Sequence, residues 1–151
     1  GLAPVRLVIV GDGPERAALE AQVASLGLVG QVTFTGHRED TPALYAGFDL
    51  FALSSDTEQM PLSVLEAMAS GLPVAATDVG DVAAMLAAEN AGFVVPLAED
   101  ALAGALAALI DDPELRRRLG TANRTKAARE FDQATMAQRW RALWDGTAPP
   151  A

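Results

Sequence analysis

The feature that most constrains the fold is a repeated alternation of short apolar runs with helix-forming stretches. Residues 5–10 (VRLVIV) form an apolar, β-branched run that stops at Gly11. An apolar run without strict alternation is typical of a strand covered on both faces, as in a parallel sheet. The pattern recurs along the chain. It predicts an α/β fold in three layers, with a parallel sheet between two layers of helices.

The same reading gives the expected elements. Strands are predicted over residues 5–10, 32–35, 49–55, 74–77 and 92–96. Helices are predicted over residues 15–26, 42–48, 61–70, 81–89, 101–110, 113–119, 121–130 and 134–144. Gly120 is expected to separate two of these helices, because glycine weakens a helix interior. We expect one domain over residues 1–146 and a mobile tail over residues 147–151.

Composition excludes several classes of function. The chain has 151 residues, half of them hydrophobic, which is enough for one domain with its own core. It has no cysteine, which excludes disulfides, thiolate metal sites and cysteine nucleophiles. Its one histidine, His37, leaves little scope for a histidine metal site or a serine–histidine relay. The sequence shows neither an apolar stretch of about 18 residues nor a signal peptide, so we expect a cytoplasmic protein.

Charge is distributed unevenly along the chain. Residues 1–112 carry sixteen acids against three basic residues, Arg6, Arg16 and Arg38, whereas residues 113–145 carry eight basic residues against four acids. The acidic body argues against nucleic-acid binding. The basic C-terminal part is compatible with the inner face of an anionic membrane, with an acidic partner domain, or with an ordinary solvated helix surface. Trp140 and Trp144 are four residues apart, and we expect them to form one packed helical face rather than a sugar-stacking platform.

Ligands of parallel α/β sheets bind outside the carboxyl ends of the strands, which directs attention to the loops there. The first is Gly11-Asp12-Gly13-Pro14, between a predicted strand and a helix. Its backbone N–H groups could cradle a phosphate, but a plain tight turn explains the glycines equally well, because the full G-x-G-x-x-G spacing is missing.

A stronger feature lies in residues 57–73 (TEQMPLSVLEAMASGLP). Glu58 follows the third predicted strand, and Glu66 falls within a helix whose other residues are mostly apolar. A buried carboxylate needs hydrogen-bond donors, and a pair of ribose hydroxyls would supply them. The helix start at Leu62-Ser63 offers free N–H groups to a diphosphate. An exposed helical glutamate, or an ion pair of Glu66 with Arg6 or Arg38, accounts for this residue equally well.

These segments resemble a known family, the retaining GT-B glycosyltransferases of family 4, also called glycosyl transferases group 1. Glu58 and Glu66 match its pair of glutamates, and residues 65–82 (LEAMASGLPVAATDVGDV) match the usual continuation. Residues 7–16 (LVIVGDGPER), 32–37 (VTFTGH) and 111–120 (DDPELRRRLG) are similar to further family segments. The resemblance implies the Rossmann-like, donor-binding C-terminal half of such an enzyme.

The resemblance also implies roles for individual residues. Glu66 is expected to hold the ribose hydroxyls of a UDP-, GDP- or ADP-sugar, and Glu58, the catalytic candidate, to contact the transferred sugar. Backbone groups at His37 and Arg38 are expected to border the nucleobase. The remaining donor-binding candidates are Gly11, Gly13, Met60, Leu62 and Ser63. The family works without a bound metal, so neither a metal site nor a cofactor is expected.

Compared with that family, the chain lacks the N-terminal, acceptor-binding domain and the first strand and helix of the donor-binding half. The absent strand is a central one, which leaves a gap between the strands predicted over residues 5–10 and 49–55. We therefore expect this edge to close by association, for example in a swapped homodimer. The alternative to part of an enzyme is a stand-alone, non-catalytic module that binds a nucleotide sugar or a partner.

Overall fold

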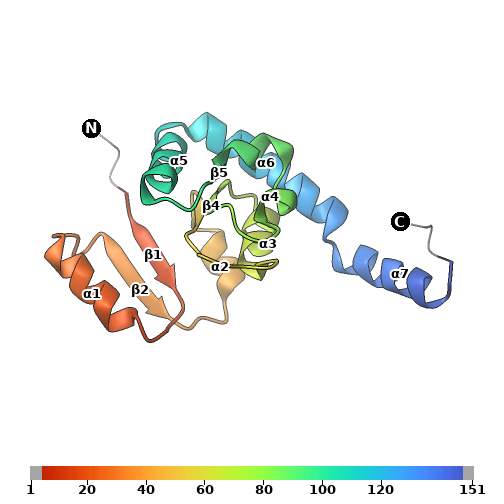
Figure 1. Cartoon of the computed structure of the whole chain (residues 1–151), viewed down its shortest axis with the longest axis horizontal. Helices are drawn as coiled ribbons and strands as arrows, with labels where there is room; N and C mark the ends of the chain where they lie inside the picture. The colour runs from red at the N-terminus through yellow and green to blue at the C-terminus, as the bar shows by residue number, and fades with distance from the viewer. Residues whose placement is uncertain (1–4, 148–151) are drawn as a thin grey trace. The chain divides into compact units, whose positions relative to one another are not determined.

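The computed structural model describes residues 5–147, and the chain divides into two compact units, Gly1–Leu44 and Tyr45–Ala151 (Figure 1). Unit 1 contains β1 (Leu7–Val10), α1 (Arg16–Ser25) and β2 (Val32–Gly36). The two strands pair in parallel, with Leu7 opposite Val32. The short helix α2 (Thr41–Tyr45) spans the boundary between the units.

Unit 2 contains a three-stranded parallel sheet with the order β3-β4-β5. The strands are β3 (Phe51–Leu53), β4 (Val74–Thr77) and β5 (Val94–Val95). The helices are α3 (Leu62–Ala69), α4 (Val82–Met85), the 3-10 helix η1 (Ala88–Phe93), α5 (Glu99–Asp111), α6 (Pro113–Glu130) and α7 (Gln133–Trp144). The predicted α/β fold with parallel sheets is confirmed.

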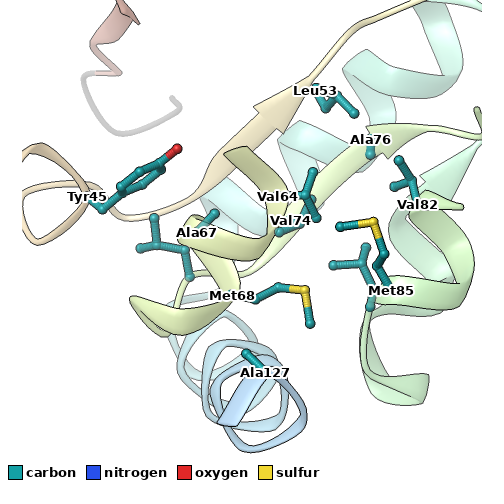
Figure 2. Close-up of a cluster of buried hydrophobic side chains, with 12 residues drawn as sticks. Tyr45, Leu53, Val64, Ala67, Met68, Val74, Ala76, Val82, Met85 and Ala127 are labelled. Carbon is teal, nitrogen blue, oxygen red and sulfur yellow. The ribbon is translucent and has the colours of Figure 1, made fainter. Parts of the chain in front are cut away.

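Strand β4 lies at the centre of this unit, and all four of its residues are buried. Val74 and Ala76 pack in one core cluster with Val64, Ala67 and Met68 of α3, as Figure 2 shows. Ala75 points to the opposite face, because side chains alternate along a strand. It packs there in a second cluster with Ala105 and Leu109 of α5 and Leu119 of α6. The sheet of unit 2 is therefore the middle of three layers, and burying each large apolar side chain contributes about 1.5–3 kcal/mol.

Two asparagines carry the polar part of the core. Asn90 and Asn123 are both fully buried. The Asn90 side chain bonds both backbone groups of Val74, at 3.0 and 2.7 Å. The Asn123 Nδ2 donates to the Leu72 carbonyl and to Asn90 Oδ1, while its Oδ1 accepts from the Ala87 N–H. No buried side-chain polar atom of residues 5–147 lacks a partner, so these amides tie η1 and α6 to the edge of β4.

The prediction of two helices separated by Gly120 is wrong. Residues Pro113–Glu130 form one helix, α6, and Gly120 lies in its interior. A Cβ atom at this position would lie within 1.9 Å of the Gly71 carbonyl oxygen. Gly120 therefore serves close packing of α6 on the turn after α3, not helix termination.

Three further expectations need correction or limits. The helix predicted over residues 81–89 is shorter, because α4 ends at Met85 and the 3-10 helix begins at Ala88. Trp140 and Trp144 do not form a packed face, since their side chains are 62% and 88% exposed. Of the predicted tail, residues 148–151 lie outside the described part of the chain, and the N–H of Thr147 donates to the Ala142 carbonyl.

The strand order also bears on the expected gap. Among residues 5–147, β1 pairs only with β2, and β3 pairs only with β4. The two strands that flank the gap therefore belong to separate sheets, and each has one edge without a partner strand in this part of the chain. Neither α6 nor any other described helix is long and apolar enough to cross a membrane.

Candidate functional site

The predicted site residues divide between the two units. Gly11, Gly13, His37 and Arg38 belong to unit 1, whereas Glu58, Met60, Leu62, Ser63 and Glu66 belong to unit 2.

In unit 1 the loops after β1 and β2 meet. The Gly11 N–H donates to the Gly36 carbonyl at 2.9 Å, and both glycines have positive φ. The Gly13 N–H donates to Asp12 Oδ1 at 2.8 Å, and this carboxylate also pairs with Arg16 at 3.3 Å. The Gly13 amide is thus already hydrogen-bonded within the loop, which is the arrangement of a tight turn. Donor binding by Gly11 and Gly13 stays a prediction.

His37 and Arg38 follow β2 and are exposed. The Arg38 guanidinium forms a two-pronged pair with the Asp40 carboxylate, at 2.7 and 2.6 Å. Hydrogen bonding from Arg38 holds the pKa of Asp40 below its usual value. Since this side chain is engaged, the backbone groups of His37 and Arg38 are what this loop can offer to a nucleobase.

In unit 2 the loops after β3 and β4 are joined by a chain of hydrogen bonds that ends on Glu58. Thr77 Oγ1 donates to the Ser55 carbonyl at 2.6 Å, and Ser55 Oγ donates to Glu58 Oε1 at 2.8 Å. Glu58 is half-buried. Its carboxylate is therefore held at the carboxyl end of the sheet with lone pairs left to accept from further hydroxyls.

Gly80 fixes the same loop from the other side. Its φ is +52°, and a Cβ atom there would lie 2.5 Å from the carbonyl oxygens of Glu58 and Gln59. The N–H of Asp81 donates to the Gln59 carbonyl at 2.8 Å. Sequence analysis did not single out Ser55, Thr77 or Gly80, although Gly80 falls inside the family segment over residues 65–82.

The N-terminus of α3 lies between the two glutamates in sequence. Pro61 occupies the N-cap position, no side chain caps the helix, and the Val64 N–H bonds the Pro61 carbonyl. The N–H groups of Leu62 and Ser63 come at the positive end of the helix dipole, where anions bind favourably. Pro61 contributes no N–H. The Met60 and Leu62 side chains are 44% and 71% exposed, so this helix start is open to a ligand.

Glu66 differs from its expected environment. The helix does bury Val64, Ala67 and Met68, but Glu66 projects from the opposite face and is exposed. No ion pair joins Glu66 to a basic residue within residues 5–147, and Arg38 pairs with Asp40 instead. The expectation of a costly buried carboxylate is wrong, because the helix has one apolar face rather than apolar surroundings.

Tyr45 is a neighbour of Glu66 that sequence analysis missed. Its ring is 92% buried, counting from an exposure of 8%, and its hydroxyl donates to the Ser63 carbonyl at 3.2 Å. Burial, and then hydrogen bonding and charge from Glu66, raise the pKa of Tyr45. The hydroxyl therefore stays protonated and can help to orient the Glu66 carboxylate. A lone tyrosine in an acidic helix carried no sequence signal for this role.

The electrostatics of unit 2 set a limit on how it could stabilise an anion. The sequence has no lysine or arginine between Arg38 and Arg116. Near Glu58 and Glu66, a diphosphate would meet helix N–H groups rather than cations. Among the described residues, no group of three or more His, Asp or Glu side chains is arranged to hold a metal ion.

Comparison with known proteins defines the class. The family model described as glycosyl transferases group 1 matches residues 2–126. The chain is 37% identical over 117 residues to alpha-D-kanosaminyltransferase of Streptomyces kanamyceticus, covering 76% of this chain and 30% of that enzyme. Among solved structures, HepE of Anabaena in complex with UDP superposes with a TM-score of 0.86 at 29% identity, covering 94% of this chain and 41% of HepE. The C-terminal domain of the group 1 protein LpcC from Francisella tularensis gives a TM-score of 0.75 at 27% identity, covering 85% of this chain and 70% of that domain.

The fold and the paired glutamates thus define a C-terminal domain of GT-B type. The chain belongs to the glycosyl transferases group 1 family, and the predicted resemblance is confirmed. It spans less than half the length of alpha-D-kanosaminyltransferase and of HepE.

Proposed function

We propose that the chain is the donor-binding part of a retaining glycosyltransferase that moves a sugar from a nucleotide sugar to an acceptor. The observation that carries the proposal is the placement of Glu58 and Glu66 on either side of the uncapped start of α3. Each carboxylate can accept hydroxyls, and the N–H groups between them suit a diphosphate. Membership of the family and the likeness to HepE, solved with UDP and with UDP-glucose, support this assignment.

In this proposal the residues have separate tasks. Glu66 accepts hydrogen bonds from the two ribose hydroxyls, while Glu58, held by Ser55, contacts hydroxyls of the transferred sugar. The helix start stabilises the leaving diphosphate as negative charge develops in an oxocarbenium-like transition state. We propose that no metal ion or cofactor takes part.

Parts of the protein outside this chain complete the reaction. Because the chain spans less than half of its relatives, we propose that the acceptor is bound by a separate, N-terminal domain, and that this chain alone does not turn over. We also propose that it works in the cytoplasm.

Titration calorimetry with UDP, GDP and ADP tests the donor site. We expect one nucleotide to bind, and Glu66→Ala to weaken it by about tenfold or more, because hydrogen bonds to charged groups contribute about 1.5–3 kcal/mol. Glu89→Ala, which removes an exposed carboxylate from η1, is the matched control and should bind like the parent chain. Equal affinity of the parent and Glu66→Ala for every nucleotide would contradict the ribose assignment.

A second candidate function is a non-catalytic binding module. The absence of basic residues between Arg38 and Arg116 favours it, since a diphosphate then lacks a cation near α3. A folded chain that binds none of the three nucleotides would support this alternative.

The unpaired strand edges support one further part of the proposal. In unit 1, Leu7 and Val10 of β1 are 49% and 39% exposed, and exposed strand edges tend to recruit another strand. We propose that this edge closes by association, for example in a homodimer. Light scattering across the micromolar range should show a mass that rises with concentration, and a constant monomer mass would contradict it.

A further inference from the structure

Helix α7 carries an apolar stripe that nothing in the described chain covers. None of its twelve residues is buried, and Figure 1 shows it beyond the end of α6, apart from the other elements of unit 2. The stripe consists of Met136, Trp140, Leu143 and Trp144, which are 51%, 62%, 62% and 88% exposed. Since successive helical residues are rotated by about 100°, this spacing places all four side chains on one face.

The charges of α7 are arranged around that stripe. At the same rotation, Arg139 lies beside Leu143 along one border of the stripe, and Arg141 lies along the other border. The helix contains no acidic residue between Asp132, which caps its start, and Asp145, which follows its end. The opposite face carries uncharged side chains such as Gln138 and Thr135. An apolar face bordered on both sides by cations fits an occupant that is apolar inside and anionic at its surface.

A helix of this length also needs a surface to be stable. Isolated helices shorter than about 12–15 residues are marginal in water, and most helical stability comes from packing of an apolar face. Tryptophan is enriched where an apolar phase meets water, because its ring is apolar and its N–H is polar.

We propose that α7 is an interfacial helix that binds the surface of a membrane rich in anionic lipids. Met136, Trp140, Leu143 and Trp144 enter the acyl boundary, while Arg139 and Arg141 contact headgroup phosphates. This surface lies outside the donor site and is independent of the proposed function.

Two objections can be weighed from the charges. A second copy of the chain is a poor occupant, because pairing two α7 stripes would bring the arginine borders of both helices together. The overall charge of −9 opposes approach to an anionic surface, but charges further away than a Debye length of about 8 Å are largely screened at physiological ionic strength. The local charge of α7 therefore decides the interaction.

The chain supplies its own probe for this interaction. Its only two tryptophans are Trp140 and Trp144, so intrinsic tryptophan emission reports on α7 alone. We expect vesicles of phosphatidylcholine mixed with phosphatidylglycerol to shift the emission to the blue and to co-sediment the chain. Vesicles of phosphatidylcholine alone should do neither, and added salt should reverse the effect.

Three double variants keep both tryptophans and separate the contributions. Met136→Gln with Leu143→Gln should weaken binding by at least about tenfold, because two apolar side chains no longer leave water. Arg139→Gln with Arg141→Gln should weaken it by about 30-fold on anionic vesicles, at about fivefold per arginine. Ala134→Gln with Gln138→Ala changes the uncharged face with the same two residue types and should bind like the parent chain.

Two outcomes would overturn the proposal. One is a folded parent chain whose emission and sedimentation do not respond to anionic vesicles. The other is self-association in the absence of lipid that the Met136→Gln, Leu143→Gln variant abolishes, which would assign the stripe to a protein contact instead.

Discussion

The contact between Gly120 and Gly71 makes a sharp prediction about the stability of unit 2. In Gly120→Ala the new Cβ atom would lie 1.9 Å from the Gly71 carbonyl oxygen and 2.9 Å from its carbonyl carbon. Both atoms belong to backbone, so no flexible side chain can give way. The turn after α3 is itself constrained, because Gly71 has a φ of +79°. Helix α6 must therefore move away from the turn by roughly 1 Å or more, which a close-packed interior resists.

The magnitude follows from three contributions. Overpacking of this kind costs about 1–3 kcal/mol. The same movement strains the bond from Asn123 Nδ2 to the Leu72 carbonyl, and a buried group left unsatisfied costs about 1–3 kcal/mol. Replacing glycine by alanine inside a helix returns about 1 kcal/mol. We expect a net loss of about 2–4 kcal/mol, which corresponds to a melting temperature on the order of 10 °C lower.

A matched control lies in α5. Gly104 is also inside a helix, but it is exposed and a Cβ atom there would meet nothing within 4 Å. Gly104→Ala should therefore stabilise the chain by about 0.5–1 kcal/mol through helix propensity alone. Thermal and urea denaturation followed by far-ultraviolet circular dichroism measure both variants. The reasoning is refuted if Gly120→Ala is as stable as the parent chain or if both alanines stabilise it.

Three more outcomes can be measured. Asn123→Ala should lower the free energy of unfolding by about 3 kcal/mol in urea titrations, because it strands several buried polar groups; an unchanged midpoint would contradict the network. Tyr45, the only tyrosine, has a raised pKa, so its contribution to stability is complete below about pH 10 and is lost as the pH rises further. Phenolate absorbance should therefore appear only above that range, and Tyr45→Phe should lack this alkaline loss of stability. Asp132 has a pKa lowered by hydrogen bonding from the Thr135 N–H, so its cap of α7 persists below about pH 4 and is lost as the pH falls through the lowered value; the amide shift of Thr135 in nuclear magnetic resonance should follow that titration.

The sequence predicted the alternation of elements well, because each strand is a short apolar run bounded by glycine, proline or acidic residues. The whole of β4, residues Val74–Thr77, has its predicted bounds, since it is buried on both faces and its sequence reflects that. The strands at the sheet edges are shorter than predicted. Apolar residues such as those around Phe51 continue beyond the last paired residue because they pack against α3 and α5 without joining the ladder.

What the sequence could not predict depends on contacts between distant residues. Gly120 has the local appearance of a helix end, and only the approach of Gly71 shows that its missing side chain serves packing. The exposure of Glu66 was misjudged because neighbouring apolar residues of a helix need not surround the residue between them. The hold of Thr77 and Ser55 on Glu58 joins two loops across two parallel strands, which no local pattern encodes.

The cation-free stretch between Arg38 and Arg116 has a consequence for proteolysis. Trypsin cleaves only after lysine and arginine, so it cannot cut anywhere in the loops that carry Glu58 and Glu66. Arg38 is exposed in the loop after β2, shortly before the boundary between the two units at Leu44 and Tyr45. Limited digestion should therefore separate most of unit 1 first and release the sheet of unit 2, with both glutamates, in a single piece.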